Sequence, residues 1–304
     1  MRQLQCQSPE SLSDSEIKAI ADRAYVRAAD MLASCQGMRA TRGALLVRTA
    51  QGRREHRQGE GSQEKCRQGE GSYSADQAKE GERTMQFPTV VGIHDIETHL
   101  ADGRSVRYTL SVSADAPDDD RRPLILILHY AGTPTRFYGR PLLEYLFEPA
   151  LRGLAPVCLA PEAICGQWHE EENESFVMQV LDGARAAYGV DPSRVVVGGY
   201  SMGALGTWHL IAHYPERFSA ALPIAGYPRH DLECTVPVHA FHSAADELFP
   251  LAALTESVAA LAQAGRPITL TTAAVNGHFD VNGYRDALSA APAWLRRVWR
   301  GAAG

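Results

Sequence analysis

Lysine is absent from one part of the amino-acid sequence, and phenylalanine and tryptophan are absent from the other. Its three lysines all precede residue 85, whereas all eight phenylalanines and all four tryptophans follow residue 84. No apolar run approaches the ~20 residues of a membrane-spanning helix, so we expect no stable membrane insertion. The first thirty residues also lack the apolar segment of a secretory signal, which makes the cytoplasm the expected location.

Paired cysteines and metal-binding motifs are also missing. The six cysteines show no C-x-x-C spacing, which predicts free thiols rather than a zinc site or a disulfide framework. His209 and His213 have the i, i+4 spacing of two zinc ligands, but the segment between them has no adjacent glutamate and suggests no third ligand. We therefore expect neither a metal nor another cofactor.

Clustered positive charge is absent from the C-terminal part of the chain. Residues 85–304 contain 16 arginines, no lysine and 24 Asp and Glu residues. Binding to a phosphate backbone depends on clustered cations. The composition therefore argues against nucleic acid as a partner.

The chain divides into two parts of different composition. Residues 1–84 have only two aromatic residues and contain the hexapeptide RQGEGS twice, at 57–62 and 67–72. This composition offers little from which to build a core that would offset the entropy lost when the chain is ordered. We therefore expect a largely disordered extension with one helix at about 14–34. We hypothesise that the working domain is 85–304 and that 1–84 is dispensable or reflects a misassigned start.

Residues 85–304 show a pattern of alternating strands and helices. Two alternating runs, 89–98 and 104–113, predict an antiparallel hairpin. The segments after the hairpin predict a mostly parallel central sheet with helices on both faces. Strands are expected at 123–129, 155–161, 194–200, 220–225, 236–242 and 267–275, and helices at about 140–153, 172–189, 202–214, 250–264 and 282–299.

A serine stands between two glycines where one of these strands meets a helix. The motif Gly199-Tyr200-Ser201-Met202-Gly203 follows the apolar run VVV and opens a helical segment. A sharp strand-to-helix turn of this kind presents a hydroxyl at the carboxyl edge of the sheet, and small neighbours avoid clashes there. This context predicts that Ser201 is a nucleophile.

A serine nucleophile needs a base, and the base needs an acid to orient it. Asp246 lies just past the end of the strand VPVHAFH, with Glu247 beside it as a rival. Either carboxylate is also a plausible helix cap. His278 lies in the loop after the strand ITLTTAAV and is the candidate base, the alternative being an ordinary surface histidine.

These residues and the stretch from Trp168 to Gly226 resemble the α/β-hydrolase superfamily, and in particular the small esterases of the phospholipase/carboxylesterase and dienelactone-hydrolase-like group. The sequence is also similar to poly(3-hydroxybutyrate) depolymerase-like esterases. The resemblance implies an α/β-hydrolase fold with Ser201 as nucleophile, Asp246 as acid and His278 as base. Only about ten residues separate the strands near 226 and 236, which leaves no room for a large lid.

The resemblance also implies an oxyanion hole formed by the Met202 N–H and a second N–H from the loop that begins at His129. The family usually has His-Gly where this chain has His129-Tyr130, so the second donor is Ala131 or Tyr130. Trp168 and Tyr130 follow strands and are candidate lining residues of a substrate pocket.

The expected activity is cleavage of a small-molecule carboxylic ester through an acyl-enzyme on Ser201. A serine peptidase and an acyltransferase of the same fold would share these residues. A non-catalytic ligand-binding relative is the remaining alternative. The sequence carries no indication of an oligomeric state.

Overall fold

The computed structural model describes residues 85–301, except 101, 116–120, 133–134 and 229–232. The predicted extension 1–84 and its helix at 14–34 lie outside the described residues. Everything that follows concerns the part of the chain predicted to be the working domain.

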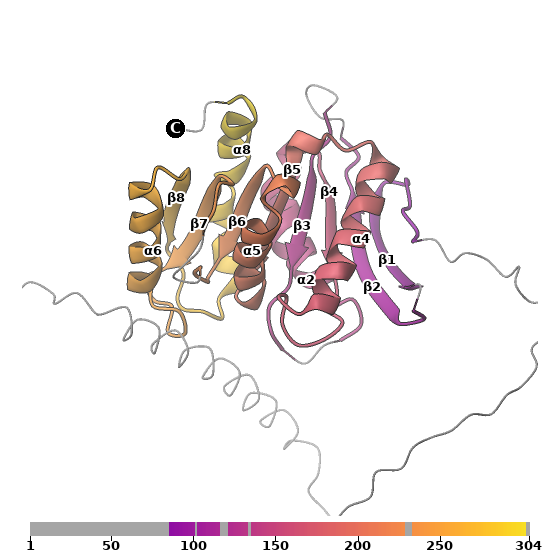
Figure 1. Ribbon diagram of the computed structural model, residues 1–304, viewed down its shortest axis with the longest axis horizontal. Helices are drawn as coiled ribbons and strands as arrows, with labels where there is room; N and C mark the ends of the chain where they lie inside the picture. Colours follow the sequence, from indigo (N-terminus) through magenta and orange to yellow (C-terminus); the bar gives the residue numbers. More distant parts are fainter. Residues whose placement is uncertain (1–84, 101, 116–120, 133–134, 229–232, 302–304) are drawn as a thin grey trace, which may run out of the picture.

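The centre of this domain is an eight-stranded sheet with the order β1-β2-β4-β3-β5-β6-β7-β8 (Figure 1). β1 and β2 form the predicted antiparallel hairpin, and β2 also pairs with β4 in the antiparallel direction. All other neighbouring strands are parallel. The strands are β1 (Gly92–His99), β2 (Ser105–Val112), β3 (Leu124–Leu128), β4 (Val157–Pro161), β5 (Val195–Tyr200), β6 (Ala220–Ile224), β7 (Val238–Ser243) and β8 (Ile268–Ala273).

Helices cover both faces of the sheet. The face toward the viewer in Figure 1 carries α4 (Glu171–Tyr188), α5 (Met202–His213) and α6 (Leu251–Gln263). The opposite face packs against α2 (Arg140–Leu142), α3 (Glu148–Leu151), α7 (Tyr284–Leu288) and α8 (Ala291–Trp299). The prediction of a mostly parallel sheet between two helical layers is confirmed.

The β3 strand shows why the layers form. Its sequence LILIL is buried throughout, and its side chains alternate between the two faces of the sheet. Leu124, Leu126 and Leu128 belong to the core under α4 and α5, whereas Ile125 and Ile127 belong to the core on the other face. A continuous apolar run is therefore what a strand buried on both sides requires.

Two predicted helices are interrupted. The helix predicted at 282–299 is a short 3-10 turn followed by α7 and α8, and Pro292 lies in the first turn of α8. Proline lacks a backbone N–H and clashes with the preceding turn, so it starts a helix more readily than it continues one. The helix predicted at 140–153 likewise consists of α2, a π-helical turn (Leu143–Phe147), α3 and a 3-10 turn (Arg152–Leu154).

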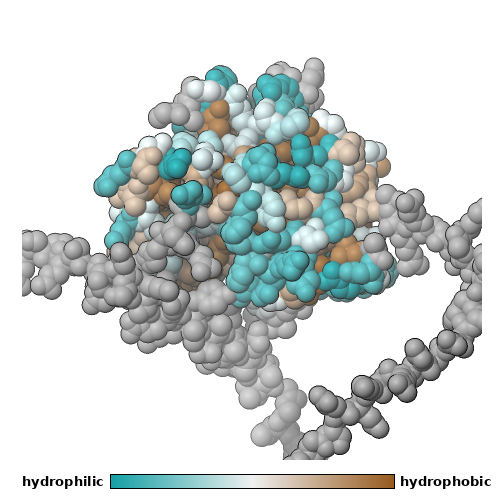
Figure 2. Space-filling model, viewed as in Figure 1, coloured by the Kyte–Doolittle hydropathy of each residue, from teal (hydrophilic) through white to brown (hydrophobic). Residues whose placement is uncertain are grey.

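The described surface contains both hydrophilic and hydrophobic residues (Figure 2). On the face in view, hydrophobic residues form separate small patches among hydrophilic ones (Figure 2). Within the described ranges, no helix combines the length and apolar character needed to cross a membrane. The β6–β7 connection carries no helix in its described parts, 225–228 and 233–237, in agreement with the expected absence of a large lid.

Candidate active site

Ser201 occupies a strained turn between β5 and α5. Its φ of 56° and ψ of −116° lie outside the regions that non-glycine residues favour. The turn is tight enough that a Cβ on Gly199 would lie 2.3 Å from the Gly203 carbonyl oxygen, and a Cβ on Gly203 would lie 1.9 Å from the Leu128 carbonyl oxygen. Only glycine fits at these two positions, as the sequence predicts, and the turn holds the serine at the carboxyl edge of the sheet.

Ser201, His278 and Asp246 meet at that edge. The Ser201 Oγ lies 2.8 Å from the His278 Nε2, and the His278 Nδ1 lies 2.9 Å from the Asp246 Oδ2. An ionised carboxylate accepts hydrogen bonds only, so the Nδ1 carries the proton and the Nε2 is free to accept one from the serine hydroxyl. The three residues are 7%, 2% and 7% exposed, which keeps both hydrogen bonds largely away from water.

The turn after β7 fixes the carboxylate of Asp246. Its Oδ1 accepts hydrogen bonds from the backbone N–H groups of Leu248 and Phe249, at 2.9 and 2.7 Å. His242 is fully buried nearby, where burial lowers its pKa, and its Nε2 lies 2.6 Å from the Phe249 carbonyl oxygen. Because a neutral imidazole at His242 forms no ion pair with Asp246, the negative charge of Asp246 can stabilise a positive charge on His278.

Glu247, the rival acid in the sequence, contacts a different part of His278. Its side chain is exposed, and its Oε2 accepts a hydrogen bond from the backbone N–H of His278 at 2.8 Å. The geometry therefore distinguishes the two carboxylates. Asp246 contacts the imidazole ring, and Glu247 contacts the main chain of the same residue.

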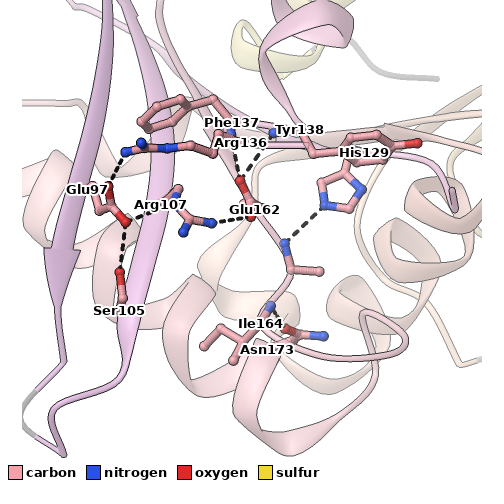
Figure 3. Close-up of polar contacts among 11 residues, drawn as sticks. Glu97, Ser105, Arg107, His129, Arg136, Phe137, Tyr138, Glu162, Ile164 and Asn173 are labelled. Carbon is pink, nitrogen blue, oxygen red and sulfur yellow. Dashed lines mark hydrogen bonds and ion pairs between the residues drawn. The ribbon is translucent and has the colours of Figure 1, made fainter. Parts of the chain in front are cut away.

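His129 anchors the loop that carries the candidate second oxyanion donor. Its Nε2 accepts a hydrogen bond from the Ala163 N–H at 3.0 Å, drawn as a dashed line to His129 in Figure 3. The Nδ1 is therefore the nitrogen that donates to the Tyr130 carbonyl oxygen at 2.8 Å. Burial lowers the pKa of His129 to about 4, which keeps the ring neutral. The loop after β3 is thereby tied to the loop after β4.

Trp168 packs beneath the same loop. Its indole N–H donates to the His129 carbonyl oxygen at 2.8 Å, and a Cβ on Gly206 would lie 2.5 Å from the Trp168 Cβ. The side chain is 2% exposed. This differs from the expectation that Trp168 lines a substrate pocket. Its N–H and its ring are used in packing, so Trp168 supports the loop after β3 from inside.

The candidate oxyanion donors lie on elements that touch one another. Met202 is the first residue of α5, where backbone N–H groups have no partner within the helix. Gly203 packs against the end of β3, and Tyr130 and Ala131 follow that strand directly. Tyr130 is half-buried, with its ring centroid 6.1 Å from that of Tyr200, so it remains a candidate lining residue.

A charged network that the sequence did not indicate holds the next part of this loop (Figure 3). The Oε2 of Glu162 accepts hydrogen bonds from the backbone N–H groups of Phe137 and Tyr138, at 2.7 and 3.3 Å, and its Oε1 pairs with Arg107 at 2.8 Å. Arg107 also pairs with Glu97 on β1. The positive φ of 57° at Phe137 is sustained by this network.

His209 and His213 do not form a metal site with the residues around them. The His209 Nε2 contacts the Glu174 carboxylate, and the His213 Nδ1 lies 2.9 Å from the His209 carbonyl oxygen. Within the described part of the chain, no group of three or more His, Cys, Asp or Glu side chains is arranged to hold a metal ion.

Comparison with solved structures identifies the fold. A structure described as a thermostable esterase matches this chain with a TM-score of 0.55 and 23% sequence identity, over 67% of this chain and 62% of that chain. The chain has the α/β-hydrolase fold. In this fold, strand ends at one edge of the sheet present the reacting side chains, and Ser201, Asp246 and His278 follow β5, β7 and β8 in the chain order Ser-acid-His.

Two of the sequence relatives match short stretches of this chain. Poly(3-hydroxyalkanoate) depolymerase C of Paucimonas lemoignei is 46% identical over 52 residues, 17% of this chain and 13% of that protein. A probable chloroplastic glutamyl endopeptidase of Oryza sativa subsp. japonica is 34% identical over 102 residues, 31% of this chain and 11% of that protein. This chain therefore spans far less than two thirds of either relative. No family model matches the sequence.

Proposed function

We propose that the protein is a serine hydrolase that cleaves carboxylic esters through an acyl-enzyme on Ser201. The observation that carries the proposal is the pair of hydrogen bonds at His278, 2.8 Å to the Ser201 Oγ and 2.9 Å to the Asp246 Oδ2. Both distances suit proton transfer from an alcohol to an imidazole backed by a carboxylate.

The first half of the reaction forms the acyl-enzyme. The Ser201 Oγ attacks the ester carbonyl while the His278 Nε2 takes its proton, and Asp246 stabilises the imidazolium that results. The negative charge on the carbonyl oxygen is held by the Met202 N–H, beside the positive end of the α5 dipole, and by an N–H at Ala131 or Tyr130. His278 then protonates the leaving alcohol as the ester bond breaks.

The second half restores the serine. A water molecule gives a proton to the His278 Nε2 and attacks the acyl carbonyl, and the bond between the acyl group and Ser201 breaks. The proton on the imidazole returns to the Ser201 Oγ, and the carboxylic acid leaves. No residue ends with a changed charge, so the cycle repeats.

An apolar surface beside the base favours a substrate with an apolar group. Phe279 is 51% exposed, and its ring meets that of His278 edge-on with the centroids 5.4 Å apart. A half-exposed phenylalanine gains free energy when an alkyl or aryl group covers it. We therefore propose esters with an apolar acyl or alcohol part as the substrate class.

A serine peptidase is the second candidate, favoured by the stretch that is similar to a probable glutamyl endopeptidase. An acyltransferase would differ only in transferring the acyl group to an alcohol. The test compares wild-type protein and Ser201→Ala on p-nitrophenyl esters and on peptide p-nitroanilides, with and without added methanol. Ester hydrolysis that requires Ser201 and exceeds both anilide cleavage and methyl-ester formation supports the proposal; the opposite preference, or activity that survives in Ser201→Ala, contradicts it.

A further inference from the structure

Two consecutive carboxylates after β7 hold one histidine at two different atoms. Asp246 binds the Nδ1 of the His278 ring, at 2.9 Å, and Glu247 binds the backbone N–H of His278, at 2.8 Å. The first contact belongs to the reaction proposed above. The second lies outside the reacting atoms, and the reaction as described does not use it.

Gly277 shapes the main chain so that this second contact is possible. Its φ is +144°, a conformation that residues with a side chain rarely adopt, and a Cβ at this position would lie 2.8 Å from the Glu247 Oε2. The glycine thus allows the loop before His278 to pass directly over the carboxylate. The close approach depends on the Asn276-Gly277-His278 loop and the Asp246-Glu247 turn together.

We propose that Glu247 is a positioning residue: it holds the main chain of His278 so that the imidazole is aligned with Ser201 and Asp246 at the same time. This inference rests on the proposed function of the site. The turn that carries Glu247 is itself fixed, because the Asp246 Oδ1 accepts the N–H groups of Leu248 and Phe249. Glu247 therefore provides a firm attachment for the histidine loop.

The physical reason for the effect is the sensitivity of proton transfer to distance. The hydrogen bond from the His278 N–H to the Glu247 side-chain oxygen fixes the main chain of the histidine. Without it the short loop at His278 gains freedom, and the imidazole spends less time within hydrogen-bonding distance of Ser201. Displacements of about 1 Å at a reacting group can cost ~100-fold in rate, so partial loosening is expected to cost about tenfold.

Three single variants distinguish the positioning of His278 by Glu247 from an effect of the Glu247 charge. Glu247→Ala removes the acceptor and the charge, whereas Glu247→Gln removes the charge and keeps an oxygen that accepts the His278 N–H. Glu256→Ala is the matched control, because Glu256 is an exposed glutamate on α6. Kinetics with a p-nitrophenyl ester give kcat and KM for each variant, and far-UV circular dichroism confirms folding.

A second readout does not depend on turnover. A proton held between an imidazole Nδ1 and a carboxylate gives a strongly downfield ¹H NMR signal, and its loss in His278→Gln would assign it. The signal reports alignment of the ring with Asp246 even where no ester is cleaved. It therefore tests the positioning role separately from the proposed function.

We expect Glu247→Ala to lower kcat about tenfold with little change in KM and to lose the downfield signal. We expect kcat of Glu247→Gln to stay within about twofold of wild type and the downfield signal to remain. The same is expected of Glu256→Ala. Wild-type kcat and signal in Glu247→Ala, or equal impairment of the Gln and Ala variants, would overturn the proposal. If the wild-type protein does not hydrolyse esters, the proposed function is wrong. The NMR comparison still decides the role of Glu247 in that case.

Discussion

The Nε2 of His278 and the Oγ of Ser201 lie 2.8 Å apart although 77 residues separate them in the sequence. The sheet brings them together, because β5 and β8 are parallel to the two strands between them and therefore end at the same edge. Because both residues follow strands of one sheet, the sheet fixes the positions from which their side chains meet. A fixed arrangement favours the alignment that acyl transfer needs.

Asp246→Asn tests the role of the acid. An asparagine amide that keeps the Leu248 and Phe249 N–H groups on its oxygen presents N–H to the ring, which favours the wrong tautomer of His278. We expect kcat for a p-nitrophenyl ester to fall by about 10³- to 10⁴-fold at neutral pH. The matched control is Asp280→Asn, whose carboxylate instead accepts from the Gly283 N–H; a similar loss in both variants would argue against a special role for Asp246.

Gly203→Ala tests the packing of the nucleophile turn. The new Cβ would lie 1.9 Å from the Leu128 carbonyl oxygen, which forces backbone to move. Overpacking of this kind costs about 3 kcal/mol, measured as the loss in the free energy of unfolding by urea denaturation. Gly189→Ala is the control, since Gly189 has a φ of 57° but no atom within 4 Å of its added Cβ and should cost only about 1 kcal/mol. Equal losses would contradict the close approach.

The buried His129 predicts a dependence of stability on pH. Its folded-state pKa is lowered to about 4 by burial, whereas its unfolded pKa is about 6.5. Because the folded pKa is the lower one, the stabilising contribution is present above pH 6.5 and is lost as the pH falls toward 4. His239, with a pKa also lowered to about 4 by burial, adds to the same loss.

At pH 5 the contribution of His129 to the free energy of unfolding should be about 2 kcal/mol smaller than at pH 7. Urea denaturation of wild-type protein and His129→Gln at both pH values measures it. The variant is expected to lose less stability between pH 7 and 5 than wild type does. An identical pH dependence in the two proteins would show that burial does not lower the pKa of His129 below its value in the unfolded state.

Phe279→Ala tests the proposed apolar contact with substrate. We expect KM for p-nitrophenyl octanoate to rise about fivefold, equivalent to roughly 1 kcal/mol of lost apolar contact, with kcat and the KM for p-nitrophenyl acetate nearly unchanged. Val91→Ala is the control, because Val91 is exposed and adjoins β1 at the opposite edge of the sheet from β8. A uniform change for both esters would rule out selective contact with the longer chain.

Local sequence patterns predicted the strand-to-helix turn at Ser201 because that turn depends on neighbouring residues. The five-residue motif and the apolar run before it determine the tight packing of Gly199 and Gly203. The choice between Asp246 and Glu247 was harder, since both follow β7. The direction of each side chain depends on a loop 31 or 32 residues away.

Contacts between distant segments account for what the sequence did not reveal. Glu162 accepts the backbone N–H of Phe137, 25 residues earlier, and pairs with Arg107, 55 residues earlier, so no local pattern indicates it. Trp168 is an aromatic residue in a loop, and only the packing on Gly206 shows that it is buried. The break between α7 and α8 had a visible signal in Pro292, which belongs in the first turn of a helix.

The central claim is that Ser201 is a nucleophile activated by His278, and covalent labelling by a fluorophosphonate tests it most directly. Intact-mass measurement should show one adduct per chain in wild-type protein, located at Ser201 by peptide mapping, and none in Ser201→Ala. A Ser257→Ala variant, altered on α6, should label as wild type does. Equal labelling of wild type and Ser201→Ala, or labelling of neither, would contradict the account.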